Sequence, residues 1–348
     1  MKFLIVKTSA IGDIIHSFPA VEYLKSRFPE AKIDWAVENS YKDLVAAHPL
    51  ISQVFPISTQ VWRKKLHHRL TWKAIGDFRK EIRQQKYDIL FDLQGNTKSA
   101  VVTALADAYE KVGFGFHSVA ERLNLVVTTH KYDIPQDLNI QETYLKLVQT
   151  HFKDLKVFQS RGVALRLTEA EETLLNQMVD KKGPRYLVAF GSNWSNKQLS
   201  EGDLKNFLEI VDREDHPYFY FIWGTEAEKQ QAVRLQAHFE KSVVVERLSL
   251  PLLQGVMRKM DLVISMDSMA LYLCGETPSF SVFGPSLAAV FNPSGRQHTY
   301  FQGSCPYGKV FSRRCPFLRS CSTGACLKNV TPEQLFARYQ QQRIIKGV

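Results

Sequence analysis

The sequence lacks any apolar run approaching the ~20 residues that a membrane-spanning helix requires. No signal-peptide layout precedes the β-rich run that begins at Lys2, so we expect a cytoplasmic protein. The Gly-x-Gly-x-x-Gly fingerprint of dinucleotide-binding folds does not follow the first strand, and a Walker motif is absent throughout. What remains, with 45% hydrophobic and 23% charged residues among 348, is a globular composition with enough chain for two domains.

Cysteine is scarce, and no Cys-x-x-Cys pair occurs. Cys274 lies alone in an apolar stretch and is expected in the core. The other four share one C-terminal segment with the spacing C-x9-C-x5-C-x4-C: Cys305, Cys315, Cys321 and Cys326. A cytosolic location argues against disulfides. Two alternatives stay open, namely four reduced thiols or a structural zinc or iron bound by thiolates.

Acidic residues are the minority among the charges, with 35 Asp and Glu against 45 Lys and Arg, which gives a formal net charge of +10. This balance favours anionic partners such as acidic lipid head groups or phosphorylated substrates. The basic residues concentrate at Arg63–Arg69 and Lys73–Arg83, where a solvated helical face is the alternative explanation. No nucleic-acid-binding signature accompanies them, so we expect no nucleic-acid partner.

Short β-rich runs alternate with helical stretches, which predicts an α/β fold with parallel, doubly wound sheets. Strands are expected at residues 1–7, 32–37, 54–57, 87–93, 111–116, 186–190, 218–223, 243–245, 262–265 and 279–283. Between the first two, we expect a short turn over residues 12–17 and then a helix with Pro19 in its first turn.

The β–α pattern restarts after residue 184, and we place a domain boundary near residue 160. The expected domains are 1–160 and 161–328, followed by a C-terminal helix in 329–348. Thr331, Pro332 and Gln334 give that helix a capping box, with Thr as the N-cap residue.

Ligands of open α/β sheets bind beyond the carboxyl ends of the strands, and this rule selects a few polar loops. They are Thr8–Asp13 and Asp92–Lys98 in the first half, and Gly191–Lys197, Trp223–Glu228, Met266–Met269 and Gly284–Ser286 in the second.

Asp13 stands at a strand-to-helix turn, where a carboxylate can cap the helix or act as a general base toward a hydroxyl. Lys197 ends a loop of small polar residues whose donors suit phosphate oxygens, with a plain surface lysine as the alternative. Asp267 and Ser268 open a helix whose N-terminus would attract an anion, unless they are simple caps.

Together these residues resemble glycosyltransferase family 9, the ADP-heptose:lipopolysaccharide heptosyltransferases, and most closely the heptosyltransferase I type that adds the first inner-core heptose. The strongest part of the resemblance is the stretch Phe3 to His16, FLIVKTSAIGDIIH. Supporting segments are Asp34–Glu38, Trp62–Lys64, Asp92–Gly95 with Lys98 and Ser99, and Phe283–Pro285.

The resemblance implies a GT-B architecture, with two Rossmann-like domains facing a cleft. The N-terminal domain would bind the acceptor, the Kdo of Kdo-lipid A, and the C-terminal domain the donor, ADP-L-glycero-D-manno-heptose. Transfer would be inverting and would need no catalytic metal or other cofactor. The basic charge would favour peripheral contact with the anionic cytoplasmic face of the inner membrane.

By position, Asp13 matches the family's catalytic base, and Lys197 matches the lysine that steadies the donor phosphates and the leaving ADP. The donor-binding positions are Ser192, Asn193, Trp223, Glu228 (or Glu226, if the loop shifts), Asp267, Ser268 and Met269. The acceptor-binding positions are Ser9, Arg63, Lys64 and Arg122.

Met269 and Tyr272 depart from the family pattern, because they stand where the family has Gly and His. Two other functions therefore stay open. One is a GT-B transferase that uses another nucleotide sugar or a protein acceptor. The other is a non-catalytic relative that binds a nucleotide sugar.

Overall fold

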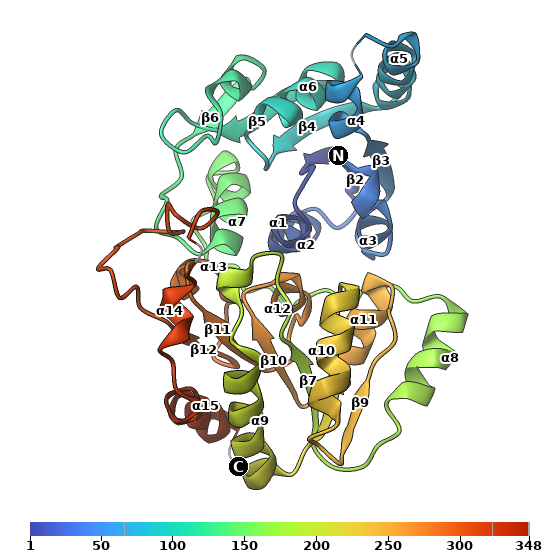
Figure 1. Cartoon of the computed structure of the whole chain (residues 1–348). Coiled ribbons are helices and arrows are strands. Elements are labelled where there is room, and N and C mark those ends of the chain that lie inside the picture. Colours follow the sequence, from blue (N-terminus) through green and yellow to red (C-terminus); the bar gives the residue numbers. More distant parts are fainter. Residues whose placement is uncertain (66, 322, 347–348) are drawn as a thin grey trace. The chain divides into compact units, whose positions relative to one another are not determined.

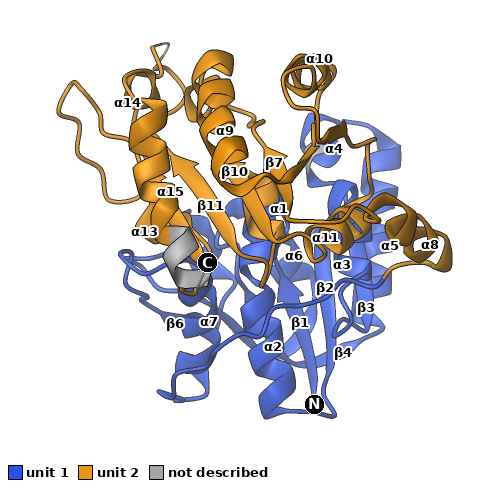
Figure 2. Cartoon of the chain, turned by 90° about the horizontal axis from the view of Figure 1, so that it is seen from below, with its two compact units in different colours: residues 1–166 blue, residues 167–348 orange. Residues whose placement is uncertain are grey.

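The computed structural model describes residues 1–65, 67–321 and 323–346. The chain divides into two compact units, residues 1–166 and 167–348, coloured separately in Figure 2. By its contacts, the segment 161–166 belongs to the first unit rather than to the second. Its last residue, Arg166, donates hydrogen bonds to the backbone carbonyls of Ala46 and His48 at 3.0 and 3.2 Å.

Unit 1 is built on a parallel six-stranded sheet with the order β3-β2-β1-β4-β5-β6 (Figure 1). Its strands are β1 Lys2–Val6, β2 Lys32–Glu38, β3 Gln53–Ile57, β4 Lys86–Asp92, β5 Asp107–Phe114 and β6 His130–Tyr132. From β1 the chain moves outward to β3, returns to β4, and then moves outward to β6 on the other side. The direction reverses between β1 and β4, so this is the topological switch point of the sheet.

Helices cover both faces of this sheet. Right-handed crossovers place α1 Ile11–His16, α2 Phe18–Arg27, η1 Asn39–Tyr41 and α3 Lys42–Ala46 on one face, where α7 Ile140–His151 packs on α2. The other face carries α4 Thr59–Lys64, α5 Arg69–Arg83, α6 Thr97–Leu105 and η2 Arg122–Val126. Buried Leu4 and Val6 of β1 meet Phe78 and Ile82 of α5 in the core of this second face.

Unit 2 repeats the design with the order β12-β11-β10-β7-β8-β9. Its strands are β7 Arg185–Ala189, β8 Tyr218–Phe221, β9 Ser242–Val244, β10 Leu262–Met266, β11 Ser279–Phe283 and β12 His298–Gln302. Its helices are α8 Glu169–Met178, η3 Ser195–Lys197, α9 Glu201–Asp215, α10 Glu226–Gln236, α11 Leu250–Met257, α12 Met269–Leu273, α13 Ala288–Phe291, α14 Ala325–Lys328 and α15 Pro332–Lys346. The switch point lies between β7 and β10.

The C-terminal helix α15 is part of unit 2. Leu335 and Tyr339 are buried in the core of this unit, and Tyr339 packs against the ring of Phe207 on α9. The expected capping box is confirmed, because the Gln334 N–H donates to Thr331 Oγ1 while the Gln334 side chain accepts from the Thr331 N–H.

The doubly wound α/β fold is confirmed, with differences in detail. Residues 11–16 form the helix α1 instead of a turn, while Pro19 does lie in the first turn of α2. β5 begins at Asp107, four residues before the expected start. The edge strands β6 and β12 were not predicted, because one is three residues long and the other carries polar side chains at both ends. Among the described residues, no helix is both long and apolar enough to span a membrane.

Candidate functional site

The loops after β1 and β4 flank the switch point of unit 1, and one side chain joins them. Gln94 lies just beyond β4, and its Oε1 accepts hydrogen bonds from the backbone N–H groups of Thr8 and Ser9, both at 3.1 Å. These bonds span the crevice in which a doubly wound sheet binds its ligand. They fix the backbone that leads into α1 and therefore the position of Asp13.

Asp92, the last residue of β4, holds the loop after that strand in place. Its fully buried carboxylate accepts from the N–H groups of Gln94 at 3.0 Å and Gly95 at 2.9 Å through one oxygen. The other oxygen accepts from Asn124 at 2.6 Å and Thr103 at 3.0 Å. A buried carboxylate is stable only when its oxygens are satisfied in this way, so Asp92 has a structural role.

Lys7 is a buried lysine that the sequence analysis did not single out. Its Nζ donates to the Leu93 carbonyl at 3.0 Å and to the Tyr144 hydroxyl at 2.7 Å. Its own carbonyl accepts from the Trp35 indole at 3.0 Å. The available signal was a lysine directly after the apolar run Phe3–Val6, because a buried ammonium needs several partners. Lys7 thus ties the carboxyl ends of β1 and β4 together.

Asp13 lies in the first turn of α1, and both interpretations of it have a structural basis. Its Oδ2 accepts from the Ala10 N–H at 3.3 Å, which is a capping contact. The residue is partly exposed. A carboxylate that caps a helix keeps further lone pairs that can accept a proton, so capping does not exclude a general base.

The acceptor-side candidates follow the carboxyl ends of three strands. Ser9 follows β1, Arg63 and Lys64 belong to α4 after β3, and Arg122 begins η2 after β5. β3 and β5 each lie two strands from β1, which corresponds to roughly 10 Å on either side. The three cationic side chains are exposed, and the Arg122 guanidinium stacks on the Phe116 ring at 4.4 Å. The carboxyl edge of this sheet therefore flanks the Asp13 loop with cations.

In unit 2 the crevice between β7 and β10 holds a buried ion pair. The Lys197 ammonium at the end of η3 lies 2.6 Å from Oδ2 of Asp267, which directly follows β10. Ser192 adds a second bridge, because its hydroxyl donates to the Asp267 carbonyl at 3.4 Å. The structure thus brings together two candidate donor-side segments that are 70 residues apart in the chain.

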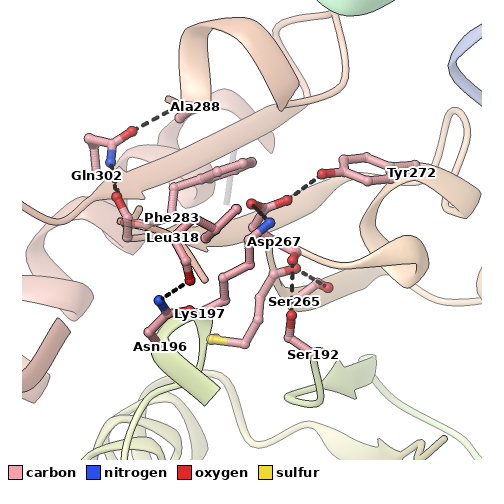
Figure 3. A network of polar contacts seen from close by, with 12 residues as sticks. Ser192, Asn196, Lys197, Ser265, Asp267, Tyr272, Phe283, Ala288, Gln302 and Leu318 are labelled. Carbon is pink, nitrogen blue, oxygen red and sulfur yellow. Dashed lines mark hydrogen bonds and ion pairs between the residues drawn. The ribbon is translucent and has the colours of Figure 1, made fainter. Parts of the chain in front are cut away.

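Tyr272 completes this group from α12. Figure 3 shows Lys197 and Tyr272 meeting at the Asp267 carboxylate, where the Tyr272 hydroxyl donates to Oδ1. Burial pushes the pKa of Asp267 upward, but the Lys197 ammonium and the Tyr272 hydroxyl outweigh burial and hold that pKa below its usual value. Asp267 is therefore ionised at neutral pH.

Lys197 retains donors for a ligand. An ammonium has three N–H groups and Asp267 takes one of them, so a phosphate oxygen can accept from another without breaking the ion pair. A surface lysine, the alternative kept open above, is excluded because Lys197 is only 9% exposed.

Glu228 lies in the first turn of α10, where its Oε2 accepts from the N–H groups of Gly224 at 2.7 Å and Thr225 at 3.0 Å. Its carboxylate also packs against the loop after β7, since a Cβ on Gly191 would lie 2.3 Å from Glu228 Oε1. Glu226, the alternative residue, is exposed at the start of the same helix.

The remaining donor-side candidates are spread around these residues. Asn193 is exposed in the loop after β7, and the Trp223 indole donates to the Val245 carbonyl at 2.8 Å. Ser268 is the N-cap residue of α12 without a side-chain capping bond, and Met269 begins that five-residue helix. Ser268 is thus not a simple side-chain cap.

The four C-terminal cysteines are all partly buried and free. Within the described residues, no three His, Cys, Asp or Glu side chains are grouped so that they could hold a metal ion. Burial raises the pKa of the Cys326 thiol, and the neighbouring Cys321, Cys305 and Cys315 raise it further. Hydrogen bonds from the Thr323 hydroxyl and nearby backbone N–H groups instead lower the pKa of Cys321. As described, the thiols are neighbours but not a metal-binding group.

The chain is similar to known proteins along most of its length. Residues 75–320 match the family model of glycosyltransferase family 9 (heptosyltransferase). The chain is 25% identical over 320 residues to lipopolysaccharide heptosyltransferase 1 of Pseudomonas aeruginosa, covering 91% of this chain and 88% of that protein. It is 26% identical over 289 residues to lipopolysaccharide heptosyltransferase 1 of Escherichia coli strain K12, covering 82% and 88%.

Among solved structures, the chain resembles E. coli heptosyltransferase WaaC with ADP. The TM-score is 0.80 at 22% identity, over 98% of this chain and 100% of that one. At this identity the likeness shows the fold, and the expected GT-B architecture of two Rossmann-like units is confirmed.

Proposed function

The chain belongs to glycosyltransferase family 9, the heptosyltransferases, and on that premise we propose that it transfers a heptose from ADP-L-glycero-D-manno-heptose to the Kdo of Kdo-lipid A. The enzyme is a glycosyltransferase of the kind that builds lipopolysaccharide. The observation that carries the donor assignment is the buried Lys197–Asp267 pair at the switch point of unit 2. The pair supports this assignment because it holds a cation at the crevice in which a doubly wound sheet binds its ligand.

The proposed reaction is an inverting, in-line displacement at the anomeric carbon of the heptose. Asp13 accepts the proton of the Kdo hydroxyl, whose oxygen forms the new bond to that carbon. The bond from the carbon to the β-phosphate oxygen breaks, and ADP leaves with the electron pair. Lys197 stabilises the charge that develops on the diphosphate, so the reaction requires no catalytic metal.

The loops around Lys197 supply the remaining donor contacts in this proposal. Ser192 and Asn193 donate to the phosphate oxygens, and Glu228 accepts from the ribose hydroxyls beside Trp223. Asp267 orients Lys197, while Ser268 and Met269 present the backbone of the α12 start to the diphosphate. The relative WaaC was solved with ADP and with ADP-2-deoxy-2-fluoro heptose, which supports an ADP-linked donor.

The assignment of the acceptor is supported by complementary charge. Kdo carries a carboxylate and lipid A carries phosphates, and Arg63, Lys64 and Arg122 flank the Asp13 loop with matching cations. Ser9 lies beside the same loop and donates to the sugar. Because the acceptor is anchored in a bilayer, we place the protein on the cytoplasmic face of the inner membrane, held peripherally by the anionic lipid surface.

The test is transfer measured in vitro with purified protein, Kdo-lipid A and ADP-heptose, with UDP- and GDP-sugars as competing donors. Asp13→Asn should lower kcat by ~10²–10⁴-fold, because a positioned base contributes that much, and should leave ADP binding unchanged. Asp43→Asn is the matched control, since Asp43 also lies in the first turn of a short helix of unit 1. Normal turnover by Asp13→Asn would refute the assignment of the base.

A cellular experiment tests the substrate. Cells lacking this protein should make a lipopolysaccharide core truncated at Kdo, which mass analysis detects. A core of normal length, or a missing protein modification with an intact core, would favour another acceptor.

A structural zinc or iron at the cysteines is a separate proposal. It is supported by the position of Cys305, Cys315, Cys321 and Cys326, which all fall in one short segment. Binding would require this segment to close further than described, because the thiols do not form a metal-binding group as they lie. Metal analysis of freshly purified protein, with the four-fold Cys→Ser variant as control, decides the question. Less than about 0.1 metal per chain would end the proposal.

A further inference from the structure

The junction of α4 and α5 carries a dense positive charge. We call residues 61–65 and 67–73 the α4–α5 tip. It contains the five exposed cations Arg63, Lys64, Lys65, Arg69 and Lys73, together with His67 and His68. No Asp or Glu occurs anywhere between Leu44 and Gly76 in the sequence. Within the tip itself no acidic residue offsets this charge, and the first one along α5 is Asp77, one turn beyond Lys73.

The same tip exposes large apolar side chains. Leu70 is 77% exposed, Trp72 is 60% exposed, and Val61 is 51% exposed. Leu70 and Trp72 both lie in the first turn of α5, a helix that Figure 1 shows at one end of unit 1. Further along the same helix, Phe78 and Ile82 are buried against the sheet. The helix is thus anchored to the sheet while its first turn presents apolar side chains to the surroundings.

The tip cations lack partners inside the described part of the chain. Within that part, none of the five forms an ion pair or stacks on an aromatic ring. The segment that contains the four C-terminal cysteines, residues 305–321 and 323–326, also combines basic and apolar residues, but its cations do have partners. In that segment Arg314 stacks on the Phe291 ring at 4.5 Å, and Arg319 lies over the Trp194 ring at 5.8 Å. The chain satisfies those cations itself, whereas the tip leaves its charge available to a partner.

Because exposed cations and exposed apolar side chains lie together there, we propose that the α4–α5 tip is a docking element for an anionic lipid bilayer. Cations beside exposed aromatic and aliphatic side chains match the boundary between lipid head groups and acyl chains. Trp72 and Leu70 enter that boundary, while Lys65, Arg69 and Lys73 contact the lipid phosphates. A nucleic acid would match the charge but would leave Leu70 without a partner.

The inference deepens the proposed function and rests on it, because it names the surface that brings the enzyme to a membrane-anchored acceptor. Arg63 and Lys64 end the preceding helix α4, so docking by α5 would hold them at the depth of the lipid phosphates. Leu70 and Trp72 have no part in the proposed acceptor or donor contacts. Docking and catalysis can therefore be separated by mutation.

The experiment measures co-sedimentation of the full chain with vesicles of phosphatidylglycerol and phosphatidylcholine that contain no acceptor. Wild type should bind these vesicles, should not bind pure phosphatidylcholine, and should bind less as salt rises. Leu70→Gln/Trp72→Gln should bind at least tenfold more weakly while keeping the same thermal midpoint, because both side chains are exposed. The matched control is Leu174→Gln/Val233→Gln, which removes exposed apolar side chains from α8 and α10 of unit 2 and should bind like wild type.

A transfer assay on a delipidated, water-soluble acceptor separates the two proposals. There the Leu70→Gln/Trp72→Gln variant should retain wild-type kcat. If wild type fails to transfer heptose but still binds vesicles through the tip, the proposed function falls and the docking element stands. Equal vesicle binding by wild type and the tip variant overturns the docking proposal. Binding of wild type to RNA but not to vesicles would overturn it as well.

Discussion

Lys197 and Asp267 show how one buried pair can serve both the fold and the proposed chemistry. Asp267 is only 3% exposed, and its charge is tolerated because Lys197 and Tyr272 both donate to it. The same contact fixes the ammonium in the crevice of unit 2. The Tyr272 hydroxyl donates to Asp267, which pairs with Lys197, so Tyr272 is a positioning residue that holds the carboxylate in place.

Removing one partner of this pair should be more damaging than removing both. Lys197→Met leaves Asp267 buried without its cation, which should lower the free energy of unfolding by about 3–5 kcal/mol. In Lys197→Met/Asp267→Leu the unpaired charge is gone, so part of that stability should return. Urea unfolding of the two single variants and the double variant measures the coupling. Strictly additive losses would contradict a coupled pair.

The buried histidines should make stability depend on pH. Burial, aided by the nearby Arg166 guanidinium, lowers the pKa of His48 to about 3, and burial lowers that of His298 to about 4. The unfolded chain binds these protons near pH 6.5, whereas the folded chain does not. This stability is fully present well above pH 6.5 and is lost as the pH falls from 6.5 toward the folded pKa values of about 3 for His48 and about 4 for His298, with a loss of about 2 kcal/mol per histidine at pH 5.

Unfolding by urea at pH 7 and pH 5 checks this dependence. His48→Asn keeps an acceptor for the Leu50 N–H, which His48 Nδ1 accepts at 3.2 Å, but it does not titrate. The variant should lose about 2 kcal/mol less than wild type between the two pH values. An identical pH dependence would show that His48 is protonated in the folded state.

At the scale of elements, each half of the candidate site is built where a polar loop follows a central strand. Gln94 joins the loops after β1 and β4, and Ser192 and Lys197 join the loop after β7 to the end of β10. In both units the joining side chain crosses the switch point. This position explains why these polar residues stand beside strands that are otherwise apolar.

The contact between the loop after β7 and the start of α10 requires a glycine. In Gly191→Ala the new Cβ would lie 2.3 Å from Glu228 Oε1, so the Glu228 carboxylate must move. We expect ADP affinity to fall by about tenfold, because Glu228 is a proposed ribose contact. Isothermal titration with ADP measures the change.

Gly202→Ala is the matched control for that substitution. Gly202 lies in α9, and a Cβ there meets nothing closer than 4.0 Å. Alanine in a helix should raise stability by roughly 0.5–1 kcal/mol and should leave ADP affinity unchanged. Equal ADP affinities for the Gly191 and Gly202 variants would remove Glu228 from the donor site.

At the scale of the whole molecule, the chain is two separate compact units, each with its own sheet. The proposed donor residues all belong to unit 2, and the proposed base and acceptor cations all belong to unit 1. In this proposal, the donor binds to unit 2 and the acceptor binds to unit 1, although the two sheets have the same topology.

This division predicts where ADP protects the protein. At about 100 times its Kd, ADP should stabilise the unit that binds it by about 2.7 kcal/mol. Hydrogen exchange should therefore slow in peptides covering residues 190–198, 223–228 and 266–269. Peptides from Asp13 and from α4 should exchange as before. Protection confined to unit 1 would reverse the assignment of the two halves.

Much of this protein followed from the sequence because the deciding signals are local. Alternating strands and helices predicted the doubly wound fold, and the strand-end rule selected the loops that contain Asp13, Lys197 and Asp267. The capping box at Thr331 was likewise confirmed, since it depends on residues only three positions apart.

The tertiary structure decided what depends on contacts between distant residues. It showed that Lys197 is buried and paired with Asp267, that Lys7 and Gln94 bind the ends of β1 and β4 together, and that Glu228 packs on Gly191. It also revealed that Leu70 and Trp72 stay exposed beside the basic cluster. Pairing and burial are set by how segments far apart in the chain pack, and no local pattern encodes them.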